Sequence, residues 1–303
     1  MPTNDSSPLV AWLNASRPQT LPAAWTPVWI GSAFAFYEGG FSWVVFTLAL
    51  TSASLIQIGT NFANDYFDSK TGVDIDRIGF ERPTSSGALS SKEMAWGTTI
   101  TMILAFLSGL GLVWIAGLPI LWIGLASLFF GFAYTGGPFP LAYNGLGDLF
   151  VWLFFGVIAV MGTTYAHLQE WSETAFWLGS ATGALCINIL VANNLRDIEA
   201  DRKAHKRTVG VLFGERFLKM EYTSMIGLAF GIHGRLYLSG GFEAWWALVV
   251  VIILPFLVLP LKQVWHHHDK SILNGTLKQS ALVLMIYGLS ISSSLILTRL
   301  LSS

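Results

Sequence analysis

Two clusters of acidic and amide side chains are the residues in this sequence best suited to chemistry. The first is Asn64–Asp65–Tyr66–Phe67–Asp68, and the second extends from Asn193 to Asp201. In each cluster the polar groups recur every three or four residues, so they share one helix face if the preceding apolar segment continues as a helix. Carboxylates one turn apart repel each other, which costs a helix a few tenths of a kcal/mol. Such clusters therefore indicate a cation held between the side chains.

The donor types indicate magnesium. Carboxylate, amide and water oxygens suit Mg²⁺, whose coordination is typically completed by substrate phosphates. The four aspartates Asp65, Asp68, Asp197 and Asp201 are predicted to be both catalytic residues and metal ligands. The amides Asn64 and Asn193 are predicted to complete the metal sites.

Basic residues follow both clusters and change the prediction from a cation site to a metal–diphosphate site. Arginine can bind phosphate oxygens through two parallel hydrogen bonds, while lysine supplies a point charge. A bare cation would need acids alone, whereas interleaved acids and bases are typical of a metal–diphosphate. The predicted diphosphate-binding residues are Lys70, Arg77 and Arg82 after the first cluster, and Lys206 and Arg207 after the second.

The helices that must position these clusters can be read from the apolar runs. The chain is 53% hydrophobic and 12% charged, about half the charged fraction of a soluble domain. A bilayer is crossed by about 20 apolar residues in a helix, since backbone groups cannot go unpaired in lipid. We expect an all-α polytopic membrane protein with about nine transmembrane helices, at about 21–37, 41–63, 95–116, 118–134, 149–165, 174–195, 222–239, 244–261 and 279–298.

The distribution of basic residues predicts the orientation. With a cytoplasmic amino terminus, 15 of the 17 lysines and arginines lie on the cytoplasmic side, and Arg235 and Arg299 are the exceptions. This bias follows the positive-inside rule and persists if the segment 222–239, the weakest of the nine, does not cross. We therefore expect a multi-pass protein of the inner (cytoplasmic) membrane with both clusters facing the cytoplasm. The long connections from about Asp65 to Met94 and from about Arg196 to Glu221 should lie on that face.

A short repeated pattern suggests how the chain is organised. Asn64-x-x-x-Asp68 and Asn193-x-x-x-Asp197 have the same spacing, and each follows an even-numbered predicted helix. This match is compatible with an internal duplication of about 21–135 and 149–261. We expect one membrane domain over 1–303, with this pseudo-repeat as a possible origin.

The sequence resembles the UbiA superfamily of intramembrane aromatic prenyltransferases. That family carries an Asn-Asp-x-x-Asp-type motif after the second helix and an Asp-x-x-x-Asp motif after the sixth, which correspond here to Asn64–Asp68 and Asp197–Asp201. Within the superfamily the resemblance is strongest to the branch that acts on 1,4-dihydroxy-2-naphthoate in menaquinone biosynthesis. The similar stretches are ASRPQTLPAA (15–24), NDYFDSKTGVDIDR (64–77), YTGGPFPLAYNGLGDLFVWLFFGVIAVMGTTY (134–165) and NNLRDIEADRKAHKRTVGVLFG (193–214).

This resemblance implies a helical bundle around a central cavity, capped by two aspartate-rich loops and open to lipid. It implies Mg²⁺-assisted loss of diphosphate from a polyprenyl diphosphate. The naphthoate ring would then attack the allylic cation and lose its carboxylate, giving demethylmenaquinone. In such a reaction metals stabilise charge on the leaving diphosphate, and the cavity must exclude water. The implied partners are the polyprenyl diphosphate, the aromatic acceptor and membrane lipid; no nucleic acid is expected.

The sequence departs from the family pattern at one position of the first cluster. Many relatives place a third acid four residues after Asp68, where this chain has Gly72. Asp74 follows at the spacing of the naphthoate branch, and Asp76 is nearby. We expect Asp74 rather than Asp76 to complete the first metal site.

Four further residues are predicted to line the substrate pocket: Arg17, Tyr66, Tyr134 and Asp148. An ionisable residue such as Asp148 at the edge of a membrane helix is a functional candidate, which either contacts the aromatic substrate or pairs with a basic residue. Arg17 precedes the first predicted helix and either anchors it at the interface or reaches substrate. Aromatic faces such as Tyr66 and Tyr134 can stabilise a cation, although core packing is the commoner role of such residues.

Two alternatives stay open. The acceptor could be another phenolic compound, such as 4-hydroxybenzoate or homogentisate. The chain could also be a cation transporter rather than an enzyme. Transporter sites usually lie near mid-membrane, whereas here the acids gather at one face, and this favours the enzyme.

Overall fold

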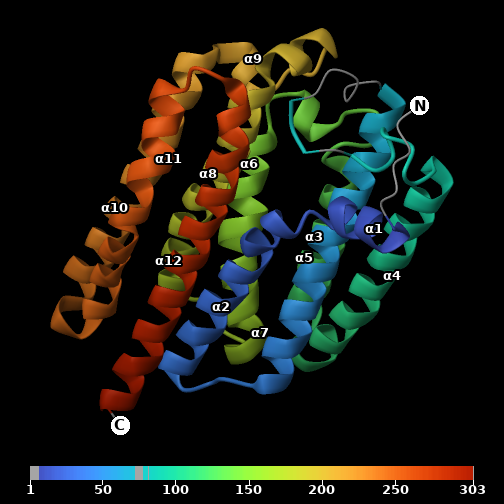
Figure 1. Cartoon of the computed structure of the whole chain (residues 1–303). Helices are drawn as coiled ribbons and strands as arrows, with labels where there is room; N and C mark the ends of the chain where they lie inside the picture. The colour runs from blue at the N-terminus through green and yellow to red at the C-terminus, as the bar shows by residue number, and fades with distance from the viewer. Residues whose placement is uncertain (1–6, 72–77, 81, 303) are drawn as a thin grey trace.

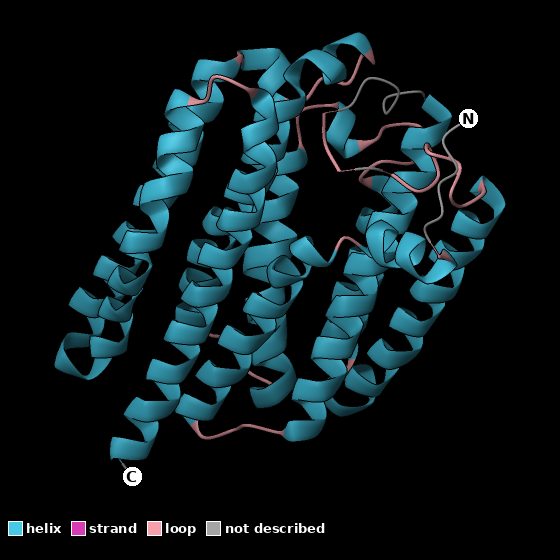
Figure 2. Cartoon of the chain, in the orientation of Figure 1, coloured by secondary structure: helices cyan, strands magenta, loops and turns pink. Residues whose placement is uncertain are grey.

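The computed structural model describes residues 7–71, 78–80 and 82–302, and over these ranges the chain is helical with no strand (Figure 2). The helices are α1 Pro8–Ser16, α2 Leu21–Glu38, α3 Trp43–Thr71, α4 Ser91–Ala116, α5 Leu118–Ala133, α6 Gly147–Trp152, α7 Ile158–Leu168, α8 Glu173–Lys203, α9 Val209–Phe213, α10 Glu215–Gly240, α11 Leu254–His266 and α12 Leu273–Ser302. A π-helical segment, Leu153–Val157, joins α6 to α7. Short 3₁₀ turns occur at Pro18–Thr20, Leu141–Tyr143 and Lys270–Ile272, and a longer 3₁₀ segment, Gly241–Ile253, leads into α11.

The long helices run side by side as a bundle (Figure 1), with α8 near its centre. Of the most apolar 18-residue stretch of α8, 83% is buried, against 17% for α4. α8 packs against α10, α12 and the π-helical segment, while α2 packs against α12 and α7, and α3 against α4. Large apolar side chains on the outside, such as Trp114 and Leu238, are exposed. An apolar exterior of this kind is expected of a bundle that faces lipid.

Each of the nine ranges predicted to cross the membrane is largely helical. Among the described residues, six helical segments are long and apolar enough to cross, namely 43–70, 91–116, 147–168, 173–203, 244–266 and 270–302. α5 is apolar but has only 16 residues. The chain is therefore an integral membrane protein, while the count of nine spans stays a prediction.

The loops that were expected to carry the acidic clusters begin later than the sequence predicted. α3 continues to Thr71 and α8 to Lys203, so Asp65, Asp68 and the second cluster lie on the last turns of helices. The next helix after the first cluster, α4, begins with a capping box in which the Ser90 side chain accepts from the Glu93 amide and the Glu93 carboxylate accepts from the Ser90 amide. α9, the last turns of α3 and the connection that follows α5 lie at the same end of the bundle (Figure 1).

Three glycines allow α8 to approach the π-helical segment backbone to backbone. A Cβ added to Gly156 would stand 2.5 Å from both the Gly179 carbonyl oxygen and the Gly183 Cα. Small residues four apart on a membrane helix commonly permit such close packing. This contact fixes the segment that presents Phe150 and Phe154 beside the centre of the bundle.

Candidate active site

A cavity of about 370 Å³ extends from the acidic end of the bundle towards the opposite end. Asp65 and Asp68 line one part of it, and Leu112, Val113 and Ile120, at the distant ends of α4 and α5, line another. Its size is within the usual range for small-molecule sites. The cavity therefore combines a charged entrance with a long apolar interior.

The first acidic cluster lies at the end of α3 and is almost fully buried. Asp68 accepts a hydrogen bond from the Tyr143 hydroxyl at 2.7 Å and forms an ion pair with Arg82 at 2.9 Å. Asp65 is 1% exposed; its Oδ2 accepts from the Thr84 amide at 3.4 Å. Its Oδ1 has no hydrogen-bond partner in the part of the chain that the structure describes. A buried carboxylate oxygen in this state is costly unless a ligand engages it.

The second cluster is organised by Arg196, a residue to which the sequence interpretation gave no role. Its guanidinium binds Asp197 through two contacts of 2.7 and 2.6 Å, and it also donates to the side-chain oxygens of Asn193 and Asn274. Asn274 in turn donates to the carbonyl of Ile78, in the segment after the first cluster. The sequence signal for this role was an arginine directly before the aspartate of the motif.

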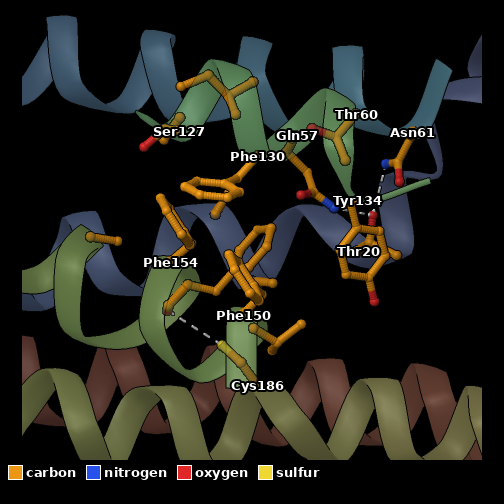
Figure 3. Close-up of a pocket in the computed structure, with 18 of the residues that line it drawn as sticks. Thr20, Gln57, Thr60, Asn61, Ser127, Phe130, Tyr134, Phe150, Phe154 and Cys186 are labelled. Carbon is orange, nitrogen blue, oxygen red and sulfur yellow. Dashed lines mark hydrogen bonds between the residues drawn. The ribbon is translucent and has the colours of Figure 1, made fainter. Parts of the chain in front are cut away.

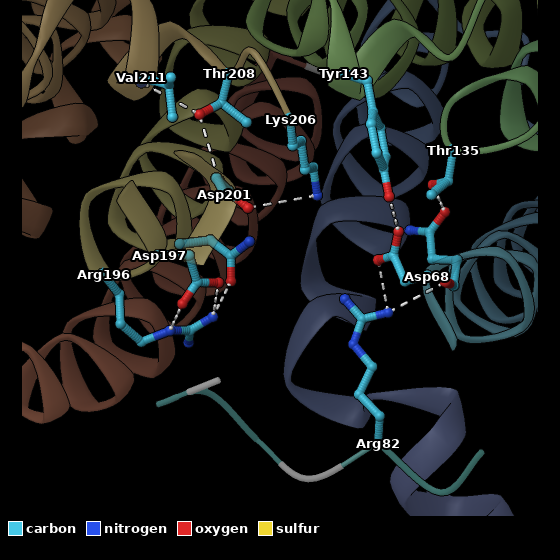
Figure 4. A network of polar contacts seen from close by, with 12 residues as sticks. Asp68, Arg82, Thr135, Tyr143, Arg196, Asp197, Asp201, Lys206, Thr208 and Val211 are labelled. Carbon is cyan, nitrogen blue, oxygen red and sulfur yellow. Dashed lines mark hydrogen bonds and ion pairs between the residues drawn. The ribbon is translucent and has the colours of Figure 1, made fainter. Parts of the chain in front are cut away.

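The two clusters face one another, with basic side chains between them (Figure 4). Lys206 stands 3.9 Å from Asp201 and 5.1 Å from the centre of the Tyr143 ring, whose hydroxyl reaches Asp68. Asp201 also accepts from the Thr208 hydroxyl at 3.3 Å. The cations that pair with the acids are thus close enough to bind phosphate oxygens instead.

The residues present fit Mg²⁺ only if phosphate completes its coordination. Among the residues that the structure places, no three His, Cys, Asp or Glu side chains gather closely enough to hold a metal unaided. What the site does offer is the unengaged Oδ1 of Asp65 and the amides Asn64 and Asn193 on the cavity wall. Mg²⁺ characteristically takes one or two carboxylates together with waters and substrate phosphates. The side chains of Asp74, Asp76 and Arg77 lie outside the described residues.

The structure brings some of the other predicted residues to the cavity and leaves some elsewhere. Arg82 and Lys206 line the cavity, as do Arg17, Tyr134 and Asp148. The side chains of Lys70 and Arg207 are exposed and do not line it. Tyr66 is not on its wall either: it packs near Phe62 beside α1, and its hydroxyl accepts from Lys70. These three lie away from the predicted contacts because their helical or loop positions turn them outward.

Arg17 reaches the cavity through an unusual backbone. It ends α1 in the left-handed conformation, with φ 49°. Such a conformation is uncommon for a residue other than glycine. Strained residues of this kind cluster at functional sites. The turn brings a fixed positive charge to the same wall as the first acidic cluster.

An aromatic cluster borders the cavity beyond the charged end (Figure 3). The Phe130 ring lies 4.9 Å from that of Phe150 and 5.2 Å from that of Phe154, and the last two stack at 5.8 Å. Phe130 and Phe150 were not among the residues singled out from the sequence. The four-residue spacing of Phe150 and Phe154 was the available signal. Tyr134 lies nearby.

These features define an α-helical membrane protein with a metal–diphosphate type of site above an apolar cavity. The UbiA prenyltransferase family model matches residues 24–287, and the chain belongs to this family.

Relatives of known function match nearly the whole chain. A 1,4-dihydroxy-2-naphthoate octaprenyltransferase from Escherichia coli strain K12 is 34% identical, over 93% of this chain and 94% of that protein. The enzyme of the same name from Mycobacterium tuberculosis is 31% identical, over 94% and 96%. Among solved structures, a UbiA homolog from Archaeoglobus fulgidus bound to GPP and Mg²⁺ aligns with a TM-score of 0.65 at 16% identity, over 93% of this chain and 99% of that one. This last likeness supports the fold.

Proposed function

We propose that this protein transfers a polyprenyl group from a prenyl diphosphate to 1,4-dihydroxy-2-naphthoate, with loss of the carboxylate, to give demethylmenaquinone. The observation that carries the proposal is the pair of facing acidic clusters, of which Asp65, Asp68 and Asn193 line one end of an apolar, aromatic-lined cavity. The names of the relatives from Escherichia coli and Mycobacterium tuberculosis supply the acceptor. The reaction belongs to menaquinone biosynthesis.

The acidic clusters are assigned to Mg²⁺ and the neighbouring bases to diphosphate. Asp65, Asp68, Asp197 and Asp201 would hold the metal with Asn64 and Asn193, and Asp74 is proposed to add a further ligand. When bound, Mg²⁺ supplies positive charge that stabilises the departing diphosphate. Arg82 and Lys206 are now paired with Asp68 and Asp201, and we assign them to the phosphate oxygens.

The rest of the cavity is assigned to the prenyl chain and the acceptor. Burial of an isoprenoid tail along Leu112, Val113 and Ile120 lowers the free energy of binding. The faces of Phe130, Phe150 and Phe154 can stabilise positive charge on the allylic carbon. The same side chains exclude water, which would otherwise capture that carbon.

The location of the site in the cell follows the charge distribution. We assign the protein to the inner membrane with the end that carries α9 and both clusters facing the cytoplasm. Lys206 and the other basic residues of the α8–α10 connection lie at that end, in agreement with the positive-inside rule. The naphthoate and the diphosphate head group of the prenyl donor would then reach the site from the cytoplasmic side.

The acceptor can be tested directly with purified protein, Mg²⁺ and a prenyl diphosphate. Parallel reactions would contain 1,4-dihydroxy-2-naphthoate, 4-hydroxybenzoate or homogentisate, with product measured by mass. We expect prenylated, decarboxylated product from the naphthoate, and loss of turnover when EDTA removes the metal. Product from 4-hydroxybenzoate or homogentisate but none from the naphthoate would refute the acceptor and leave the reaction class intact.

A further inference from the structure

Asp148 is a buried carboxylate on the cavity wall. It lies in the first turn of α6 and is 8% exposed. Neither of its carboxylate oxygens accepts a hydrogen bond from another residue within the described ranges, and no ion pair joins it to a basic side chain there. Burying a polar group without a partner costs several kcal/mol, and burying a charge costs more. A side chain kept in this state at a cavity wall is suited to a ligand that donates a hydrogen bond.

The surroundings of Asp148 favour an aromatic ligand. The Tyr134 hydroxyl lies against the same turn, since a Cβ added to Gly147 would stand 3.1 Å from it. Phe150, two residues further along α6, belongs to the aromatic cluster with Phe130 and Phe154. A flat ring bound in the cavity can contact these faces and Asp148, since all of them line it. Stacked and edge-on aromatic contacts of this kind are favourable beyond the area that they bury.

The charge of Asp148 excludes the other substrate as its partner. A diphosphate is anionic and would be repelled by an unpaired carboxylate. The basic residues that line the cavity, Arg17, Arg82 and Lys206, instead provide sites for anions. A dihydroxynaphthoate has both kinds of group: its carboxylate suits the basic side chains, and its hydroxyls suit Asp148.

We propose that Asp148 binds a ring hydroxyl of the aromatic acceptor and takes its proton during prenyl transfer, an inference that rests on the proposed function. The hydroxyl O–H bond breaks and its proton passes to the carboxylate of Asp148. The electron pair left on oxygen forms the ring C=O bond, and a ring π pair forms the new C–C bond to the allylic carbon. The electron pair of the breaking C–O bond leaves with the diphosphate. General base catalysis of this kind contributes about 10²–10⁴-fold in rate.

The test combines Asp148→Asn with changes in the acceptor. The substitution keeps the shape of the side chain and removes its charge. Wild-type and variant proteins would be assayed with 1,4-dihydroxy-2-naphthoate and with each of its two monomethyl ethers, which lack one hydroxyl proton. We expect kcat/KM for the diol to fall about 100-fold in the variant, with the KM for prenyl diphosphate unchanged. We also expect the variant to lose the wild-type preference for the diol over one of the ethers. The reason is that the substitution and the methylation remove the same contact, so their effects are not additive.

Glu170→Gln is the control. Glu170 is an exposed acid between α7 and α8 that does not line the cavity, so its variant should keep wild-type kinetics with diol and ethers. If Asp148→Asn fails to fold, Asp148→Glu takes its place, and we then expect a lower kcat with the ether preference retained. An unchanged kcat in that variant, or an Asp148→Asn protein that retains the full ether preference, would overturn the inference.

The inference and the proposed function fail in different ways. If wild-type protein prenylates the naphthoate and Asp148→Asn does so equally well, the function stands and the role of Asp148 is wrong. If wild-type protein uses 4-hydroxybenzoate or homogentisate instead, the naphthoate assignment is wrong. The role of Asp148 is then tested by assaying the same variants with that phenol and with its methyl ether. Failure of wild-type protein to use any of the three acceptors would refute both.

Discussion

At the scale of single residues, three of the four aspartates of the site are each held by a specific basic side chain. Arg82 pairs with Asp68, Arg196 with Asp197, and Lys206 with Asp201. Arg196 is the most deeply placed of these, at 1% exposure, and its contact with Asn274 continues to the Ile78 carbonyl. A buried arginine that donates two hydrogen bonds to one carboxylate holds that carboxylate in a single orientation, which a lysine cannot reproduce.

Arg196→Lys should therefore impair the site although the charge is kept. We expect the Mg²⁺ concentration for half-maximal activity to rise and kcat/KM for prenyl diphosphate to fall about tenfold or more, since loss of an oriented, buried charge contact costs about 1.5–3 kcal/mol. Steady-state kinetics over a magnesium series measures both. Arg202→Lys is the control, because Arg202 lies on the same helix in an exposed pair with Glu199. Equal, small effects in the two variants would contradict the positioning role of Arg196.

At the scale of elements, the approach of α8 to the π-helical segment fixes the wall of the cavity. Gly156, Gly179 and Gly183 leave no room for a side chain at this crossing. The π-helical segment begins three residues after Phe150 and contains Phe154. Single-turn π segments often occur at functional sites, where they re-aim side chains. The π-helical segment is thus part of both the close contact with α8 and the aromatic cluster.

Gly156→Ala should destabilise the folded protein. The added methyl group would stand 2.5 Å from backbone atoms of α8, and overpacking of this kind costs about 1–3 kcal/mol. Thermal unfolding in detergent should show a lower Tm than wild type. Gly227→Ala on α10 is the matched control: an added Cβ there meets no atom within 4 Å, so its Tm should be unchanged or higher, as helix propensity predicts. A Tm for Gly156→Ala equal to that of the control would argue against the close crossing.

At the scale of the whole molecule, the cavity extends far enough along the bundle for its apolar part to select prenyl length. Gly124 of α5 lines the cavity, and an added Cβ there meets no atom within 4 Å. Gly124→Phe should fill this space without disturbing the fold. We expect kcat/KM for long polyprenyl diphosphates to fall about tenfold or more, roughly the effect of losing one or two buried methylene contacts, with geranyl diphosphate little affected. Gly231→Phe on α10, away from the cavity, is the control and should leave the length preference unchanged. An equal loss of kcat/KM for short and long diphosphates in Gly124→Phe would refute the assignment of this space to the prenyl chain.

Much of the fold could be predicted from the sequence, whereas much of the site could not. The apolar runs predicted where the helices lie, because lipid forces such segments to be helical. The acidic clusters were recognisable because their spacing is local. Tyr143 was missed because its contact with Asp68 joins positions 75 residues apart. Local pattern could not show that Arg196 turns inward or that Tyr66 turns away from the cavity. The proposed pseudo-repeat of about 21–135 and 149–261 stays a prediction.

Equilibrium binding can show whether the two acidic clusters together hold a magnesium–diphosphate. Binding of an unreactive prenyl thiodiphosphate would be measured with and without Mg²⁺ for wild type, Asp68→Asn and Asp197→Asn, with Glu199→Gln as the control. Glu199 is exposed and lies between Asp197 and Asp201 on the same helix. We expect Mg²⁺-dependent binding in wild type and the control, and its loss in both aspartate variants while their Tm shows that they are folded. Wild-type affinity in either aspartate variant would contradict this expectation.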